Sequence, residues 1–451
     1  MSIFKAYDIR GTYPDQIDEA LARRIGAAIA RFLEAKCLVV GRDMREMAPR
    51  IQDAIIDGIL EQGSDVLDIG LASTPMGYYA IGKLPCDGGL VVTASHNPSE
   101  YIGFKVCRAG ARPLSGDSGI KDIERMVESD DLAPVAKHGK RDFVNVKRDF
   151  ISHIVGFAQG IRPTKMVVDY ANGMGANEAP GIFDQIANVE VIPLYEELDG
   201  SFPNHEANPL HEPNLDDLRA AVKQHQAHLG IAFDGDADRC AFVDDDGRTV
   251  PADLITVILA RGMLERHPGK GIIYDLRSSK VVPEEIARLG GRPVRERVGH
   301  SFMKETMRKE DCIGGGELSG HFYFAENYYS DCGVLACIMA LNQLSKEAVT
   351  LKQAADALRI YHGTGEINFR VSDKEAMMKQ VEETFHDAEI DHLDGVTCSY
   401  EDWWVNVRPS NTEPYLRLCV EADTPELLQA KRDQLIGLLG KPVSGHTSPV
   451  Q

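Results

Sequence analysis

A chain of 451 residues, 43% of them hydrophobic and 26% charged, is long enough for about three domains of ordinary globular composition. Its formal net charge of −20 at pH 7 argues against a nucleic-acid partner, which needs a basic face, although a cleft can still be locally basic for an anionic substrate. No apolar run approaches the roughly 20 residues of a membrane span, residues 1–5 carry no signal-peptide core, and the scattered cysteines lack a C-x-x-C pair. We therefore expect a cytoplasmic protein with reduced thiols, no zinc site and no membrane contact.

The first predicted elements are a helix and a repeated pattern of short strands. Apolar residues spaced along Gln16–Ala35 predict an amphipathic helix. A pattern of strand, loop, helix and strand, about 30 residues long, then occurs three times. The three repeats begin with the apolar runs at 37–41, 165–169 and 271–275. Each has the size of a βαβ unit, which predicts tandem α/β domains that present their loops to a shared cleft.

The last part of the chain has a different pattern. The composition near 361–365 is typical of a loop, and strands are predicted at 367–371, 403–407 and 416–420, with a closing helix at 426–439. The fold predicted for the whole chain is three tandem α/β domains with mixed sheets and a smaller C-terminal α+β domain around a central cleft. The expected domain limits are residues 1–140, 141–245, 246–360 and 361–451.

The stretch 92–98, Val-Thr-Ala-Ser-His-Asn-Pro, is the most informative part of the sequence. The apolar run 88–92 leads to Ser95 and His96 on a loop that Pro98 keeps from becoming a helix. Loops at the ends of strands bind the ligands of open α/β sheets. A serine needs a base or a phosphoryl group to take part in chemistry, and the G-x-S-x-G turn of Ser-His-Asp hydrolases is absent. An ordinary turn after a strand is the alternative.

Three aspartates alternate after another apolar run. The carboxylates of Asp234, Asp236 and Asp238, at every second residue, can converge on one hard cation. An EF-hand calcium loop is excluded because Arg239 and Asp245 stand where that loop requires Gly and Glu. A phosphatase of the haloacid-dehalogenase type, with Asp234 as its nucleophile, stays open, and so does a solvated acidic turn.

Ser95 and the aspartates together favour a phosphoserine enzyme with one Mg²⁺ ion. Phosphoryl transfer demands positioning and charge neutralisation more than covalent help. A Mg²⁺ held by Asp234, Asp236, Asp238 and one oxygen of phosphorylated Ser95 would provide both. With the aspartates present, an ordinary turn becomes the less favoured interpretation of the Ser95 loop.

Two further loops fit a sugar phosphate. Residues 314–321 (G-G-G-E-L-S-G-H) place Glu317 and Ser319 so that both point the same way if the segment is extended, which suits adjacent sugar hydroxyls. Residues 408–414 (R-P-S-N-T-E-P) join two strands, and their guanidinium, hydroxyls and backbone N–H groups can form an anion cradle with Arg417 on the next strand. The alternatives are a glycine-rich turn with a helix cap and an ordinary hairpin loop.

The chain resembles the α-D-phosphohexomutase superfamily, and within it the bacterial phosphomannomutase/phosphoglucomutase group, over essentially its whole length. The resemblance rests on four motifs in family order: 93–98 (T-A-S-H-N-P), 234–239 (D-G-D-A-D-R), 316–321 (G-E-L-S-G-H) and 408–414. The opening 4–11 (F-K-A-Y-D-I-R-G) is also similar to the family's N-terminal segment. The resemblance implies four domains around one central cleft.

The resemblance also implies a role for each motif. Ser95 would be the phosphoserine and would hold Mg²⁺ with Asp234, Asp236 and Asp238. The sugar hydroxyls would be bound by Glu317 and Ser319, and the phosphate that is not transferred by Arg408, Ser410, Asn411, Thr412 and Arg417. The reacting end would be lined by Tyr7, Arg10, Lys105 and Arg239. The acid–base candidates are His300, His321, Lys105 and Arg277, of which Arg277 suits an electrostatic contact better. His96 is also expected among the catalytic residues, although it is badly placed to act as a base toward its neighbour Ser95.

The reaction that the resemblance implies is a double phosphoryl transfer. Phospho-Ser95 would phosphorylate a hexose phosphate, and the hexose 1,6-bisphosphate, after turning around, would return its other phosphate to Ser95. We expect hexose phosphates as partners and phosphomannomutase activity, with phosphoglucomutase activity or dual specificity as the alternative. A Mg²⁺-dependent sugar phosphatase using Asp234 and a non-catalytic sugar-phosphate sensor are the alternatives from other classes. The assembly is expected to be a monomer or a homodimer.

Overall fold

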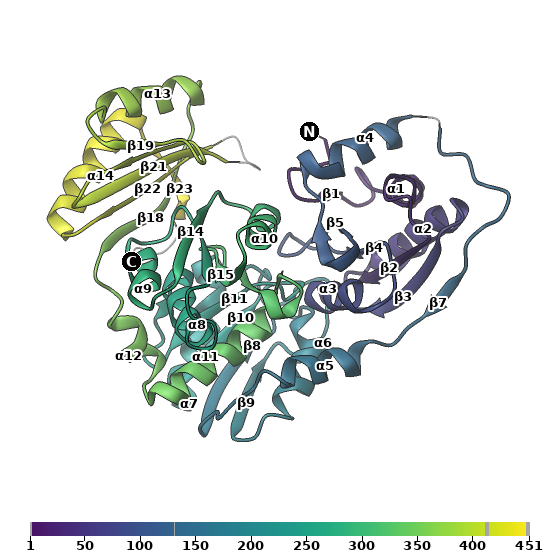
Figure 1. Ribbon diagram of the computed structural model, residues 1–451, viewed down its shortest axis with the longest axis horizontal. Coiled ribbons are helices and arrows are strands. Elements are labelled where there is room, and N and C mark those ends of the chain that lie inside the picture. Colours follow the sequence, from purple (N-terminus) through teal and green to yellow (C-terminus); the bar gives the residue numbers. More distant parts are fainter. Residues whose placement is uncertain (1, 130, 411–414, 448–451) are drawn as a thin grey trace.

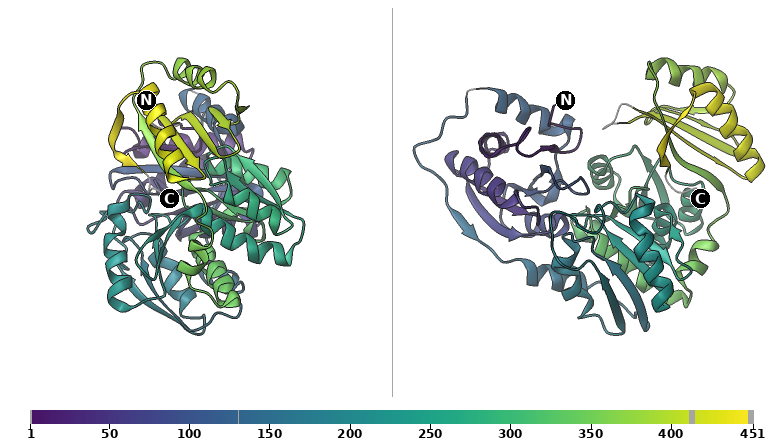
Figure 2. Two further views of the ribbon diagram at one scale, coloured as in Figure 1. Left: turned by 90° about the vertical axis from the view of Figure 1, so that its left-hand side faces the viewer. Right: turned by 180° about the vertical axis from the view of Figure 1, so that it is seen from behind.

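The computed structural model describes residues 2–129, 131–410 and 415–447. Its strands form four sheets, and the units built on them follow one another in an arc, with the first and the fourth at its two ends (Figure 1). The view from behind in Figure 2 shows the same arc, with the C-terminal unit apart from the first unit. Among the described residues, no helix combines the length and the apolar character needed to cross a bilayer.

The first unit is a mixed sheet between two layers of helices. Its elements are β1 (Ile9–Thr12), α1 (Glu19–Phe32), β2 (Cys37–Arg42), α2 (Ala48–Glu61), β3 (Asp65–Leu71), α3 (Thr74–Lys83), β4 (Gly88–Val92), β5 (Tyr101–Arg108), β6 (Arg112–Pro113), α4 (Lys121–Glu128) and β7 (Arg141–Phe143). The strand order is β1-β5-β4-β2-β3-β7, with β6 paired to β5. Leu38 and Val40 pack with α1, α2 and α4, whereas Val39 packs with α3, because successive strand residues point to opposite faces.

The helix α1 confirms the amphipathic helix predicted over 16–35, with shorter limits. It begins after Asp18, whose carboxylate accepts a hydrogen bond from the Leu21 backbone N–H at 2.8 Å. It packs closely on α2, since a Cβ on Gly58 would lie 1.9 Å from the Arg23 carbonyl oxygen. The close crossing of α1 and α2 therefore requires glycine at position 58.

The second and third units each contain five strands. The second consists of α5 (Lys147–Val155), β8 (Thr164–Asp169), α6 (Gly175–Phe183), β9 (Val189–Leu194), α7 (Asp216–His225), β10 (Leu229–Phe233), β11 (Cys240–Asp244) and β12 (Thr249–Val250), in the strand order β12-β11-β10-β8-β9. The third consists of α8 (Ala252–Arg266), β13 (Gly271–Asp275), α9 (Val281–Arg288), β14 (Arg292–Glu296), α10 (His300–Lys309), β15 (Cys312–Gly316), β16 (Phe322–Phe324), β17 (Ser330–Asp331), α11 (Gly333–Glu347) and α12 (Leu351–Asp356), in the strand order β14-β13-β15-β16-β17.

The fourth unit is an antiparallel sheet of six strands. Its elements are β18 (His362–Phe369), α13 (Lys374–Thr384), β19 (Glu389–Asp391), β20 (Val396–Ser399), β21 (Trp403–Pro409), β22 (Leu416–Ala422), α14 (Pro425–Leu439) and β23 (Pro442–Thr447), with the strand order β19-β20-β21-β22-β18-β23. The predicted strands and the closing helix are confirmed. The prediction of a loop at 361–365 is wrong, because β18 starts at His362 and pairs with β22. Its glycines allow the irregular register between Gly363 and Glu366.

The three predicted βαβ repeats are confirmed. The pairs β2 and β3, β8 and β9, and β13 and β14 are parallel, and α2, α6 and α9 connect them. The predicted mixed sheets are also confirmed, because antiparallel strands extend each of the three sheets. The loops that follow β4, β10 and β15 leave the carboxyl ends of strands in these sheets, where ligands of α/β proteins bind.

Candidate active site

The loop after β4 places Ser95 against the loop after β10. Ser95 is 4% exposed and has a left-handed backbone with φ 53°. Its Oγ donates a hydrogen bond to Asp234 Oδ2 at 2.9 Å and accepts one from Arg239 Nη2 at 3.4 Å. His96 Nδ1 lies 3.4 Å from the same oxygen, and burial, followed by the charge of Arg239, lowers the pKa of His96 well below its usual value. The predicted meeting of the serine and aspartate motifs is therefore found.

The three aspartates and Lys105 form a buried ionic cluster. Asp234, Asp236 and Asp238 are 0% exposed, and Lys105 Nζ lies 2.7 Å from Asp236 Oδ2 and also contacts Asp238. Thr74 Oγ1 donates a further hydrogen bond to Asp236 at 2.6 Å. Burial alone would lower the pKa of Lys105, but the adjacent carboxylates raise it above its usual value. Lys105 therefore carries a positive charge at neutral pH.

The aspartate cluster fits a hard divalent cation. One carboxylate oxygen from each of Asp234, Asp236 and Asp238 lies within 4.8 Å of the others. Asp236 Oδ1 and Asp238 Oδ1 are buried and accept no hydrogen bond from the described residues. Lys105 and Arg239 pair with other oxygens of these carboxylates, which leaves Asp236 Oδ1 and Asp238 Oδ1 available to a cation. A set of carboxylate oxygens is what Mg²⁺ and Ca²⁺ prefer.

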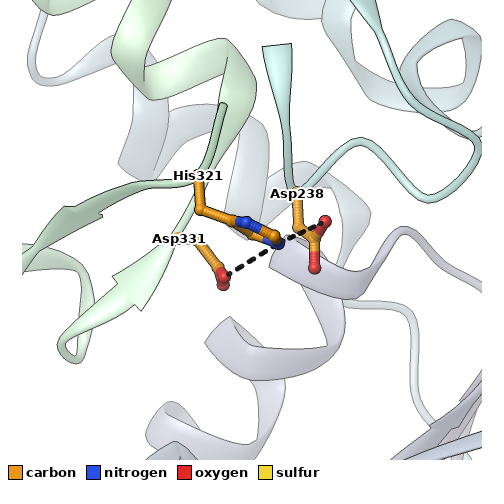
Figure 3. A group of neighbouring side chains, drawn as sticks. All are labelled: Asp238, His321 and Asp331. Carbon is orange, nitrogen blue, oxygen red and sulfur yellow. Dashed lines mark ion pairs between the residues drawn. The ribbon is translucent and has the colours of Figure 1, made fainter. Parts of the chain in front are cut away.

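His321 lies between two carboxylates from different parts of the chain (Figure 3). Its Nε2 is 3.5 Å from Asp238 Oδ1 and 3.9 Å from Asp331 Oδ2. Its Nδ1 lies 2.8 Å from Ser319 Oγ. Asp331 is also paired with Lys304 at 2.7 Å, and both side chains are 0% exposed. The predicted residue His321 thus reaches the aspartate cluster, and Ser319 contacts His321. The buried Lys304–Asp331 pair was not predicted.

A second histidine and a tyrosine extend this centre. The His300 ring stacks on that of His321 with 5.8 Å between centroids, and Tyr7 lies 5.7 Å from His300. Tyr7 Oη donates a hydrogen bond to the Val298 carbonyl oxygen at 3.0 Å. Burial lowers the pKa of both histidines well below their usual value. Nearby cations add to this effect: Lys304 and Lys105 act on His300, and Arg239 acts on His321. Both rings are therefore neutral at neutral pH and able to accept a proton.

Glu317 and Ser319 lie in a turn, so the extended arrangement considered for them is wrong. The Gly320 N–H donates to the Glu317 carbonyl oxygen at 3.0 Å, which closes the turn. The Glu317 carboxylate is 2% exposed and accepts hydrogen bonds from the Gly299 N–H at 2.8 Å and from Tyr323 Oη. Burial, together with the negative charge of Asp275, raises the pKa of Glu317 to about 7. The flanking glycines bend this loop instead of extending it, and Gly320 has a φ of 81°.

Three arginines surround Glu366 on the fourth unit. Its carboxylate lies 2.6 Å from Arg408 Nη2, 2.8 Å from Arg417 Nη1 and 3.3 Å from Arg277 Nη1. Arg408 and Arg417 are direct partners across β21 and β22, and Arg277 reaches across from the third unit. Burial alone would raise the pKa of Glu366, but the three guanidinium groups hold it at about 2. The sequence predicted Arg408 and Arg417 together in an anion cradle and Arg277 separately as an electrostatic contact, and it gave no indication of Glu366.

The remaining predicted residues lie in β1 and in the loop after β21. Arg10 Nη1 donates a hydrogen bond to Oδ1 of Asn97, which belongs to the serine motif at 93–98. Ser410 ends the described part of the loop after β21, and Asn411 and Thr412 lie outside the described residues. A cavity of about 380 Å³ opens between the first, third and fourth units, with Tyr7 in its wall. Ser95, the three aspartates and Arg408 are not among the residues that line it.

Four residues of these groups were not predicted from the sequence. Thr74, Asp331 and Glu366 contact predicted residues, with 162 residues between Thr74 and Asp236 in the sequence, and Lys304 pairs with Asp331. A lysine or glutamate in a helix or strand usually marks a solvated position. Only their burial distinguishes Lys304 and Asp331 from such solvated residues, and no short-range sequence pattern predicts that burial.

Comparison with known proteins agrees with this geometry. Residues 1–133, 148–247 and 251–361 match α/β/α domains I, II and III of phosphoglucomutase/phosphomannomutase, and 366–438 match its C-terminal domain. The phosphomannomutases of Escherichia coli K12 and Vibrio cholerae O1 are 38% and 36% identical to this chain, in both cases over 98% of it and 99% of the relative. Phosphohexose mutases of Xanthomonas campestris are 38% identical over 97% of this chain and 98% of their own length.

A solved structure has the same fold. The crystal structure of a phosphoglucomutase/phosphomannomutase family protein from Burkholderia thailandensis gives a TM-score of 0.90 with 32% identity, and the match covers 97% of this chain and 96% of that one. The likeness thus extends through all four units in their relative positions. The domain matches, in order and over most of the sequence, show that this chain belongs to the phosphoglucomutase/phosphomannomutase family.

Proposed function

We propose that this protein is a phosphomannomutase, which interconverts mannose 6-phosphate and mannose 1-phosphate through phosphorylated Ser95 and a hexose 1,6-bisphosphate. The observation that carries the proposal is the 2.9 Å hydrogen bond from Ser95 Oγ to Asp234 within the buried aspartate cluster. A serine in that position needs no hydrolase triad, because its neighbours suit a phosphoryl group. The relatives named phosphomannomutase support the choice of mannose.

The aspartate cluster is the proposed magnesium site. Asp234, Asp236, Asp238 and one oxygen of the Ser95 phosphate would hold Mg²⁺, which would supply charge neutralisation to the transferred group. Lys105 keeps its positive charge beside the same carboxylates and stabilises the negative charge that the phosphoryl group brings. Arg239, which donates to Ser95 Oγ, stabilises the charge on the leaving oxygen.

His321 is the proposed proton acceptor. In the first transfer the P–O bond to Ser95 Oγ breaks, the hydroxyl oxygen of the hexose phosphate bonds to phosphorus, and its proton passes to His321 Nε2. In the second transfer the same steps run in reverse, and the proton returns to the sugar oxygen. Burial keeps His321 neutral, and its Nε2 faces the cluster, which suits it to this role. Lys105 is less suited because its neighbours keep it protonated.

The other predicted residues are proposed to bind the substrate in both orientations. Glu317 and Ser319 are assigned to the sugar hydroxyls, and Tyr7, Arg10 and His300 to the reacting end of the cleft. The phosphate that is not transferred is assigned to a second group, formed by Arg408, Ser410, Asn411, Thr412 and Arg417 with Arg277 beside them. The shared carboxylate of Glu366 holds Arg408 and Arg417 side by side, an arrangement that suits a phosphate with several acceptor oxygens.

Dual specificity for mannose and glucose phosphates is the second candidate. It is favoured by the relatives named phosphohexose mutases, which match this chain as well as the phosphomannomutases do. Phosphorus NMR of the purified enzyme with Mg²⁺ and a trace of glucose 1,6-bisphosphate, given mannose 1-phosphate or glucose 1-phosphate in separate samples, tests both candidates. We expect the 6-phosphate in the mannose sample, and a comparable rate with glucose would establish dual specificity.

The same experiment tests the alternatives from other classes. Release of inorganic phosphate that survives Ser95→Ala would establish a phosphatase that uses Asp234 and would contradict the mutase. Binding of hexose phosphate without turnover in either sample would indicate a sensor. We further propose a cytoplasmic enzyme that acts as a monomer or a homodimer, with the domain limits predicted above, which size-exclusion chromatography with light scattering and limited proteolysis can check.

A further inference from the structure

We infer that Arg45 is a positioning residue for phosphoryl transfer, which holds the backbone of the Ser95 loop through its guanidinium group. The inference rests on the proposed function and extends it to a residue outside the four motifs. Arg45 lies in the loop between β2 and α2, next to the carboxyl end of β4. Its side chain is 0% exposed, although arginine is among the residues that are least often buried.

Every N–H of the Arg45 guanidinium has an acceptor. Nη2 donates to the carbonyl oxygens of Ser95 at 3.0 Å and Asn97 at 2.6 Å. Nη1 donates to those of Pro98 at 2.6 Å and Tyr101 at 3.1 Å. Nε donates to Asp43 Oδ2 at 3.2 Å. An arginine has five such N–H groups in a rigid planar fork, and four backbone carbonyl oxygens and the Asp43 carboxylate accept from all of them.

The loop needs such a support because its backbone is strained. Ser95 has a φ of 53°, a left-handed conformation that costs a non-glycine residue roughly 1–2 kcal/mol and persists only where the surroundings hold it. On its other side the Ser95 carbonyl oxygen is confined by the second unit, since a Cβ on Gly235 would lie 2.3 Å from it. Arg45 and Gly235 thus fix the direction in which Ser95 Oγ leaves the loop, toward Asp234.

The second unit also covers the guanidinium itself. The ring of Phe202 lies over the Arg45 guanidinium carbon at 5.2 Å from its centroid. A Cβ on Gly200 would lie 2.7 Å from the Arg45 Cα, so only glycine allows this segment to approach. Arg45 touches none of the reacting atoms, and it acts through the backbone of Ser95. It couples the serine loop of the first unit to the unit that carries the aspartates.

The test compares Arg45→Lys with Arg308→Lys in the purified full-length enzyme. Arg308 is a matched control because it also donates to backbone carbonyl oxygens, those of Gly110, Ala111 and Tyr328, but these lie in two segments other than the Ser95 loop. For Arg45→Lys we expect kcat to fall about 100-fold, with KM within about threefold of wild type, because small misplacements of reacting groups cost rates of that order. Transfer of phosphate from glucose 1,6-bisphosphate to Ser95, followed by intact mass, should slow in parallel. Arg308→Lys should keep kcat within about threefold.

Two further variants separate positioning from stability. In Arg45→Ala, added guanidinium should raise kcat at least about tenfold, a rescue that a merely destabilised protein would not show. If Arg45→Lys does not fold, Asp43→Asn is measured instead. This variant leaves Arg45 in place and removes the carboxylate that orients its Nε, so we expect a loss of about tenfold in kcat. A folded Arg45→Lys or Asp43→Asn enzyme with wild-type kcat, an equal loss in Arg308→Lys, or no rescue by guanidinium would overturn the inference. A wild-type enzyme that accepts no phosphate on Ser95 would contradict the proposed function itself, which distinguishes the two failures.

Discussion

The Ser95 hydroxyl donates a hydrogen bond of 2.9 Å to the Asp234 carboxylate, although 139 residues separate the two in the sequence. The serine leaves the first sheet after β4 and the aspartate leaves the second sheet after β10. The contact therefore depends on how the first two units pack together. It brings an oxygen that can carry a phosphoryl group to three carboxylates that can hold a cation.

Removal of the metal should abolish activity without unfolding the protein. Treatment with EDTA should reduce turnover to background, and Mg²⁺ should restore it, because the clustered carboxylates are otherwise neutralised only in part. Asp236→Asn should raise the Mg²⁺ concentration needed for half-maximal activity by about tenfold or more, since one anionic ligand is lost. The control is Asp246→Asn, which changes an exposed aspartate paired with Lys352. Full activity of EDTA-treated enzyme would contradict the proposed metal site.

Replacement of His321 should slow the chemical step. His321→Asn should lower kcat about 100- to 10,000-fold, the usual contribution of a general base, with a smaller change in KM. The matched control is His153→Asn, because His153 is a half-buried histidine that bonds to Asn327 away from the aspartates. A His321→Asn enzyme with near wild-type kcat would assign the proton transfer to another group, and His300→Asn would then be measured.

The pH dependence of kcat should reflect the neutral form of His321. Burial lowers the pKa of this histidine well below its usual value, so the base stays unprotonated as the pH falls toward neutrality and slightly below. We therefore expect no loss of kcat from protonation of His321 between about pH 8 and pH 6.5. If kcat of the wild-type enzyme instead falls with a midpoint near or above pH 6.5, and His321→Asn removes this fall, the pKa of His321 is not lowered.

Glu366 should make stability depend on acid pH. Its pKa is held at about 2, below its usual value, so its stabilising contribution is present above about pH 4.5 and is lost as the pH falls toward 2. The shift corresponds to at most about 3 kcal/mol. Glu366→Gln should lower the melting temperature at pH 7. The difference from wild type should shrink at about pH 3 to 4, where the wild-type carboxylate begins to be protonated and loses its stabilising contribution. Glu383→Gln, an exposed glutamate paired with Lys379, is the control.

The Lys304–Asp331 pair should matter for both stability and catalysis. Asp331→Asn leaves the Lys304 ammonium buried without its carboxylate, and such a loss costs about 3–5 kcal/mol. We expect a lower melting temperature together with reduced kcat, because Asp331 also borders His321 Nε2. The double variant Lys304→Met, Asp331→Asn should recover stability but not kcat. Full recovery of kcat in the double variant would limit the pair to a structural role.

Much of the fold was predictable because its signals are local. Periodicity within about 30 residues predicts the apolar runs that form β2, β8 and β13. It also predicts the helix that connects each of these strands to its parallel partner. The loop predicted at 361–365 failed for a tertiary reason. Its glycines and polar residues look like a turn, yet β22 supplies hydrogen-bond partners that extend the strand back to His362. Strand pairing overrides local composition when a long-range partner is present.

The motifs with reactive or metal-binding residues were predicted from the sequence, but the residues that contact and position them were not. The serine and aspartate motifs are contiguous, so their residue types and spacing already indicate phosphate and metal chemistry. Glu317 and Ser319 were recognised, but the turn that separates their directions depends on the hydrogen bond from the Gly320 N–H to the Glu317 carbonyl oxygen. Glu366 and Arg45 carry no local signal, since one looks like an ordinary strand residue and the other like an ordinary loop residue.

The sequence by itself determined the chain's four-part organisation, its family and the loops that carry its reactive groups, because periodicity, glycines and short motifs act within a few residues. Only the tertiary structure decided which charges are buried and what neutralises them. The contacts of Arg45 with four carbonyl oxygens lie within the first unit, whereas the contacts of Glu366 with Arg277 and of His321 with Asp238 join different units. Burial in a medium of low dielectric makes these contacts strong and shifts the pKa values of the groups in them, and burial is a property of the packed chain rather than of any short segment.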